Sequence, residues 1–195
     1  MKNDKLIKRT VLSLITSSVY ALTHCFGGLY INSWWYLFIG IYYIILSITR
    51  FSVLQVQRKA NGDFETENFA KKITGILLII LSFSLIDVVV LSGKSNHGTK
   101  YNMIIMIALA LYAFTKITLA IIGLVKSKKA FSPVAITLRN ISFADALVAI
   151  FSLQRSMLVT FPGMNDNEIK IMNIFTGSSV LIAVFILGVN LLKRK

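Results

Sequence analysis

Six long apolar stretches dominate this 195-residue chain and constrain its fold more than any other feature. An α-helix needs about 20 mostly apolar residues to cross the hydrocarbon core of a bilayer. The composition agrees, because 55% of the residues are hydrophobic and only 15% are charged, against roughly 25% charged in soluble domains. We therefore expect an all-α, polytopic integral membrane protein that forms a single membrane domain over residues 1–195. Six transmembrane helices are expected over residues 10–31, 34–54, 73–91, 103–125, 134–160 and 171–192.

The fifth apolar stretch carries boundary signals at both of its ends. Ser132 is a good helix N-cap, and Pro133 suits the first position of a helix because its fixed backbone angle is already helical. The sequence FPG at residues 161–163 predicts the end of the same helix.

Basic residues are distributed unequally between the two predicted sides of the membrane. The N-terminal segment and the segment between the second and third spans carry four Lys or Arg each, and the segment between the fourth and fifth spans and the C-terminal tail carry three each. The opposite segments carry only Lys94, Lys100 and Lys170. Cytoplasmic segments are enriched in Lys and Arg, so both termini are predicted to be cytoplasmic, with the chain crossing the plasma (inner) membrane of a bacterium. Trp34 and Trp35 then lie at the outer interface, where aromatic side chains anchor helices.

This distribution also accounts for the net charge of +13. The positive charges flank the apolar stretches in short clusters, which is typical of membrane proteins rather than of nucleic-acid-binding proteins. We therefore expect the lipid bilayer as the main partner, together with a second copy or a membrane partner protein, and no nucleic acid.

Charged side chains within the predicted spans are the best candidates for a functional or structural site. A charge at the centre of a span costs about 2.5–3.5 kcal/mol on insertion scales. Arg50 and Arg139 lie within roughly two turns of the predicted cytoplasmic ends, so both are expected to reach the interface as anchors. Lys116 and Asp145 lie at about the same depth, near ~15 Å, on consecutive helices. A Lys116–Asp145 ion pair is therefore predicted.

The remaining polar residues of the spans are expected nearer the outer side. Asp87 and His24 share a similar depth, so Asp87 is expected to face His24 or to reach Arg155. Asp145, Ser152 and Arg155 fall on one face of the fifth helix at helical spacing. This face has two interpretations: a polar pathway or small-ligand pocket between helices, or a set of pairs that fixes how the helices register.

The basic ends and the helix starts suggest a repeat of three helical hairpins inserted in the same direction. Basic clusters end the second, fourth and sixth stretches, and the glycines at positions 123 and 188 align near the ends of the last two hairpins. Parallel repeats of this kind occur in membrane transporters. The alternative is that any six apolar helices with basic loops look alike.

Residues 40–50, GIYYIILSITR, resemble the short repeat of the HdeD-type acid-resistance membrane family. That pattern has Gly-Ile, an apolar run, a second Gly and then Arg. Ser47 stands in place of the second Gly, and Ala120 replaces the Arg in the next hairpin. The resemblance implies six spans built from two-helix repeats and a role in envelope stress. As a whole the chain is also similar to six-span membrane proteins of low-GC Gram-positive bacteria.

The sequence argues against an enzyme and predicts no cofactor. Besides the carboxylates, only His24, His97 and Cys25 could ligate a metal, whereas catalytic zinc needs several such ligands. Neither a phosphate-binding glycine loop nor a serine elbow occurs. The sequence favours a non-enzymatic membrane protein with a structural, stress-related or partner-binding role. The alternative is a small transporter or channel for a proton, ion or small solute.

The first and last spans carry small-residue faces that permit close helix packing. Gly27 and Gly28 lie on the first span, and Gly177 with the two serines that follow it lies on the last. Such faces can serve packing within one chain or the seam of a dimer.

Overall fold

Six long helices make up the computed structural model, which describes residues 2–32, 34–59, 64–94, 101–127, 133–161 and 163–193. They are α1 (Lys2–Ile31), α2 (Trp34–Lys59), α3 (Phe64–Lys94), α4 (Met103–Ser127), α5 (Pro133–Thr160) and α6 (Asp166–Lys193). Each is long and apolar enough to cross a membrane, and the described ranges contain no strand. The predicted all-α fold with six spanning helices is confirmed.

Helix α5 has the predicted boundaries. It begins at Pro133 and ends at Thr160, while Ser132 and Pro162 lie outside the described residues. Gly163 has a φ angle of 142°, a conformation that only glycine adopts without strain. This glycine therefore allows the chain to turn from α5 toward α6.

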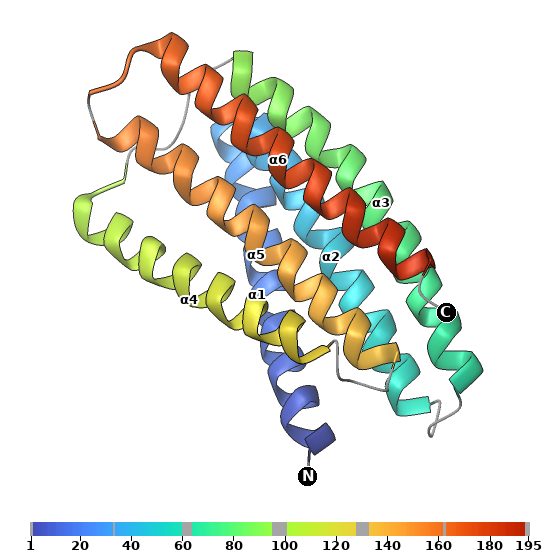
Figure 1. The fold of residues 1–195 in the computed structure, drawn as a ribbon. Coiled ribbons are helices and arrows are strands. Elements are labelled where there is room, and N and C mark those ends of the chain that lie inside the picture. The colour runs from blue at the N-terminus through green and yellow to red at the C-terminus, as the bar shows by residue number, and fades with distance from the viewer. Residues whose placement is uncertain are drawn as a thin grey trace.

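Helices α2 and α5 lie in the middle of the bundle, with α1 and α4 on one side and α3 and α6 on the other (Figure 1). The most extensive helix pairs are α3 with α6, α1 with α2, and α4 with α5. Because consecutive helices run in opposite directions, α1 begins at the same end of the bundle at which α6 ends. We call this the terminal end, and the other the distal end.

The packing does not support the predicted repeat of three hairpins. Helices α1 and α2 pack together, as do α5 and α6. In the second hairpin, α3 packs on α6 and α2, whereas α4 packs on α5. Helices α3 and α4 are therefore consecutive in the chain without forming a packed unit.

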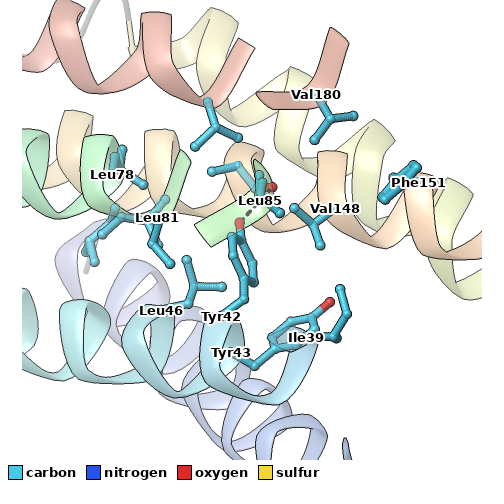
Figure 2. Packing of buried hydrophobic residues seen from close by; sticks show 14 of the residues in the cluster. Ile39, Tyr42, Tyr43, Leu46, Leu78, Leu81, Leu85, Val148, Phe151 and Val180 are labelled. Carbon is cyan, nitrogen blue, oxygen red and sulfur yellow. Dashed lines mark hydrogen bonds between the residues drawn. The ribbon is translucent and has the colours of Figure 1, made fainter. Parts of the chain in front are cut away.

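The hydrophobic core lies between α2, α3, α5 and α6 (Figure 2). Its labelled members in Figure 2 are Ile39, Tyr42, Tyr43, Leu46, Leu78, Leu81, Leu85, Val148, Phe151 and Val180. Helix α5 has the most buried span of the six, although it carries three charged residues. Polar side chains cost free energy in lipid, so the central position of α5 places them against protein instead.

Both small-residue faces lie at helix contacts within the chain. A Cβ on Gly28 would lie 2.9 Å from Cγ of Leu37, and a Cβ on Gly177 would lie 2.7 Å from a methyl group of Val89. Larger residues would force these helices apart, so the faces serve close packing inside the bundle.

Candidate functional site

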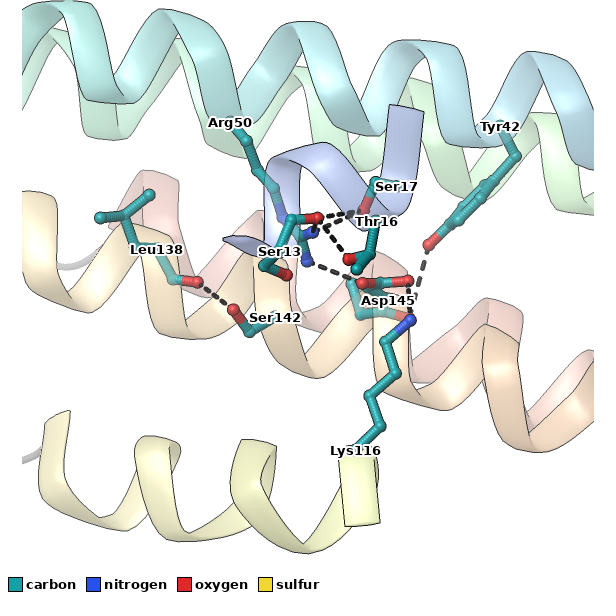
Figure 3. Close-up of polar contacts among 10 residues, drawn as sticks. Ser13, Thr16, Ser17, Tyr42, Arg50, Lys116, Leu138, Ser142 and Asp145 are labelled. Atoms are coloured by element: carbon teal, nitrogen blue, oxygen red, sulfur yellow. Dashed lines mark hydrogen bonds and ion pairs between the residues drawn. The ribbon is translucent and has the colours of Figure 1, made fainter. Parts of the chain in front are cut away.

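A buried carboxylate with two cationic partners lies at the centre of the bundle (Figure 3). Asp145 on α5 is 1% exposed. Its Oδ1 accepts a hydrogen bond from Nζ of Lys116 on α4, and its Oδ2 accepts one from Nη2 of Arg50 on α2, each at 2.7 Å. The predicted Lys116–Asp145 ion pair is confirmed, and Arg50 is a second partner.

Arg50 also reaches α1. Its Nη1 donates to the backbone carbonyl of Ser13 at 2.8 Å and to Oγ of Ser17 at 2.6 Å. The prediction that Arg50 is an interface anchor is wrong, because its side chain is 1% exposed and points inward. The carboxylate and the α1 oxygens satisfy the guanidinium, so it does not need to reach water. Arg50, Asp145 and Lys116, here called the ion network, thus connect α1, α2, α4 and α5.

The ion network carries one net positive charge, because two cations share one carboxylate. Two aromatic rings offset part of this excess. The Lys116 Nζ lies 5.8 Å from the ring centre of Tyr43 and 5.3 Å from that of Tyr112. The electron-rich faces of aromatic rings attract cations, so these tyrosines stabilise the lysine ammonium.

A cavity of about 110 Å³ lies on the distal side of the ion network, between α1, α2, α4 and α5. Polar and aromatic side chains dominate its wall. Its aromatic and polar lining consists of Tyr20, His24, Trp35, Tyr36, Tyr43, Tyr101, Tyr112, Ser152, Arg155 and Ser156, with Leu109, Ala113, Ala149 and Leu153 completing the wall. We call this space the distal cavity.

Arg155 supplies a cation to the wall of the distal cavity. The residue is 2% exposed, and its guanidinium carbon lies 4.5 Å from the ring centre of Trp35. Trp35 was predicted to anchor the outer interface, but its ring packs on this buried arginine and against the core. Trp34 is 66% exposed, so its anchoring role stays a prediction.

His24 faces the same cavity from α1. Its Nδ1 lies 2.9 Å from the backbone oxygen of Tyr20, and a carbonyl can only accept, so Nδ1 carries a proton. The ring stacks on Tyr20 with centroids 5.5 Å apart and lies 5.5 Å from the ring of Tyr36. The structure thus brings His24, Ser152 and Arg155 to one site.

Trp35 and Ser152 in the lining each have a buried hydrogen-bonding atom, Nε1 and Oγ, without a partner within the described part of the chain. The indole N–H can only donate. A buried polar atom without a partner costs about 1–3 kcal/mol, and a ligand or water that bonded to either atom would remove this cost.

The structure places Asp87 and Arg139 away from the cavity. Asp87 is exposed on the outer surface of α3, so the prediction that it faces His24 or reaches Arg155 is wrong. Depth along a helix was the basis of that prediction, and depth does not specify which face a residue occupies. Arg139 is half-buried on α5, with its Cγ near Gly123 of α4, and its anchoring role stays a prediction.

Sequence reasoning missed the tyrosines of the distal cavity. A signal was nevertheless present in the spacing, because Tyr20 precedes His24 by four residues and Tyr112 precedes Lys116 by four. Residues four apart share a helix face. Tyrosines one turn before His24 and Lys116 therefore indicated one shared environment for these two residues.

Comparisons with protein-family models, curated proteins and solved structures find no match to this chain. The resemblance to the HdeD-type repeat accordingly stays a prediction, and function has to be argued from the geometry.

Proposed function

We propose that this chain is a non-enzymatic, multi-pass membrane protein that binds a small solute in the distal cavity. The observation that supports the proposal is the polar and aromatic lining of this cavity between α1, α2, α4 and α5, in a bundle whose main core is apolar. Binding sites in helical membrane proteins and bundles commonly lie between helices, with a few convergent polar groups.

A purely structural role explains the ion network but not the groups distal to it. Arg50, Lys116 and Asp145 hold four helices together through direct contacts. Ser152, by contrast, lines the distal cavity, and its buried hydroxyl has no partner within the described part of the chain. A ligand that bonds to this hydroxyl would remove the cost of burying it.

We also propose the orientation of the protein. In the sequence the basic clusters adjoin the helix ends that lie at the terminal end of the bundle, so the positive-inside rule favours cytoplasmic termini in a bacterial inner membrane. The distal cavity would then lie in the outer half of the membrane, and a solute would enter from outside.

Cysteine reactivity tests whether the distal cavity admits a solute. The native Cys25 is replaced by alanine, and Ser152→Cys is compared with Ile182→Cys, which faces outward from α6 with Ile182 55% exposed. The probe is methyl methanethiosulfonate, which reacts with thiolates, and a thiol forms a thiolate in a polar site rather than in lipid. We expect Ser152→Cys to react and Ile182→Cys to resist, with the extent of modification measured by intact mass.

An inert Ser152→Cys in a folded protein would contradict the proposal. Equal reaction at both positions would also count against the proposal, because the cavity would then be no more polar or accessible than the lipid-facing surface. Ser156→Cys, one turn away in the same lining, is expected to react as Ser152→Cys does.

A second candidate function, assembly with a membrane partner or a second copy, is favoured by Asp87. Its carboxylate is exposed on the surface of α3, next to the exposed apolar side chains of Phe83, Ile86 and Val90. A carboxylate on a lipid-facing surface is costly unless it meets a cation or water. Asp87→Asn is expected to weaken the capture of a partner by crosslinking in cells, and unchanged capture would count against this role.

A further inference from the structure

The charges around the distal cavity are unbalanced. Among the described residues at the cavity and its floor, three cations, Arg50, Lys116 and Arg155, accompany one carboxylate, Asp145. Asp87 does not offset this excess of positive charge, because it is exposed on the outside of α3. In a low-dielectric environment such an excess creates a strong positive potential, which attracts anions and repels cations.

Several groups at the wall can donate hydrogen bonds to a ligand. Arg155 offers only donors, and the indole N–H of Trp35 is a donor without a partner among the described residues. Ser152 has a hydroxyl that can donate, also without a partner there. Together with the excess of positive charge, these donors favour a ligand that accepts hydrogen bonds and is negatively charged.

The aromatic rings do not form a free cage for a cation. Lys116 already lies over the rings of Tyr43 and Tyr112, and Arg155 lies over the ring of Trp35. Cation recognition by aromatic side chains requires open ring faces. Here the protein's own cations use these faces, and an additional cation would meet like charges.

We propose that the distal cavity binds a small monovalent anion between Arg155, the indole N–H of Trp35 and the hydroxyl of Ser152. This inference rests on the proposed solute-binding function and names its ligand class. The size of the cavity limits the ligand. At about 110 Å³, against about 10–15 Å³ of free space that one water needs, it holds at most roughly ten non-hydrogen atoms. Chloride and formate meet this limit, whereas gluconate is too large.

The test is thermal unfolding of the purified full chain in phosphatidylcholine nanodiscs. Sodium chloride or sodium formate is titrated while sodium gluconate keeps the ionic strength constant, so that general screening does not change. A ligand that binds only the folded state raises the unfolding midpoint as its concentration rises. We expect both small anions to raise the midpoint and gluconate alone to leave it unchanged.

Variants locate the anion. Arg155→Gln is expected to remove the effect, whereas Arg139→Gln, the same substitution on the same helix outside the cavity, is expected to retain it. Ser152→Ala is expected to weaken binding by about tenfold, the loss of one hydrogen bond to a charged group. Trp35→Phe removes the indole donor and keeps an aromatic ring. If Arg155→Gln does not fold, Ser152→Ala and Trp35→Phe decide.

Two results would overturn the inference: no stabilisation by either anion, or equal stabilisation of wild type and all cavity variants. Formamide, a neutral solute, and methylammonium gluconate, which supplies a small cation, are titrated in parallel. These titrations distinguish a failure of the anion inference from a failure of the proposed solute-binding function. If either of them stabilises the protein through Ser152 while the anions do not, the cavity binds a different solute class. If no class binds and Ser152→Cys is also inert, both proposals fail.

Discussion

Asp145 is the residue on which the charge balance of the bundle depends. It is the shared partner of Arg50 and Lys116, which reach it from opposite sides (Figure 3). Removing a partner from a buried ion pair leaves an uncompensated charge. Loss of each side chain therefore has a different effect on stability. Loss of the lysine leaves a balanced ion pair, whereas loss of the aspartate leaves two cations together.

The first prediction concerns the stability of variants of the ion network. Asp145→Asn is expected to destabilise the fold by about 3–5 kcal/mol, since it leaves two buried cations without a carboxylate. Lys116→Met is expected to cost much less, because the Arg50–Asp145 pair remains. The double variant is expected to stay destabilised, because Arg50 still lacks its carboxylate. Unfolding in mixed detergent micelles measures each difference.

A third substitution completes this cycle. Adding Arg50→Met to the double variant removes the last buried charge of the ion network, and apolar replacements of a buried ionic cluster are often neutral or stabilising. We expect stability to recover toward the wild type. Full recovery already in the double variant would contradict a role for Arg50.

Single residues show how much of the site could be predicted from sequence. The Lys116–Asp145 pair was predictable because both residues lie at similar distances from a short connection between their helices. The role of Arg50 was not, because its position near the end of an apolar run suits an anchor equally well. Its inward direction depends on the packing of α2 against α1 and α5, which no single helix encodes.

At the level of elements, the crossing of α3 and α6 depends on two glycines. A Cβ on Gly188 would lie 2.8 Å from Cγ1 of Ile79 and 2.9 Å from the backbone oxygen of Gly75. A Cβ on Gly75 would lie 3.0 Å from the backbone oxygen of Gly188. The two backbones therefore approach each other directly, as in other small-residue contacts between membrane helices.

The second prediction is that Gly188→Ala destabilises the protein. The added methyl group meets backbone atoms that cannot rotate away, and overpacking of this kind costs about 1–3 kcal/mol. The matched control is Gly123→Ala on α4, where the new Cβ would lie 3.7 Å from Cγ of Arg139, an ordinary contact. This control is expected to be neutral or to gain about 0.5 kcal/mol, because alanine suits helices better than glycine. Equal effects at both sites, measured by unfolding, would contradict the close crossing.

The same two glycines explain why helices were easier to predict than their arrangement. The sequence aligns Gly123 with Gly188 as equivalent positions of a repeat, yet only Gly188 lies at a tight crossing. Apolar length predicts that a helix spans the membrane. It does not say which neighbour the helix contacts, because lipid-facing and protein-facing surfaces are both apolar.

For the whole molecule, the third prediction concerns orientation. In the sequence the basic clusters adjoin the helix ends that lie at the terminal end of the bundle, so fluorescent protein fused to the C-terminus is expected to fluoresce in a bacterial cytoplasm. Alkaline phosphatase fused after α3 (Phe64–Lys94) is expected to be active, because that helix would end outside. The opposite pattern of both reporters would invert the orientation and place the distal cavity toward the cytoplasm.

The fourth prediction concerns access to the distal cavity from the two ends of the bundle. The ion network lies between this cavity and the terminal end, and Thr49, next to Arg50 on α2, is fully buried at the level of the network. Opening that side requires Arg50 and Asp145 to separate. If separation costs about 3 kcal/mol, fewer than about 1% of molecules are open at the terminal end. Thr49→Cys, with Cys25 replaced by alanine, is therefore expected to react with methyl methanethiosulfonate far more slowly than Ser152→Cys.

The rate ratio of these two cysteines also separates binding from transport. A large difference agrees with a binding protein that is open at one end. Similar rates in a folded protein would mean that the ion network opens readily and that a solute can pass both ways, as alternating access requires. Adding Lys116→Met tests the cause, because Arg50 and Asp145 then form a pair without a competing cation. If the ion network is the barrier, this substitution changes the rate at Thr49→Cys and leaves the rate at Ser152→Cys unchanged.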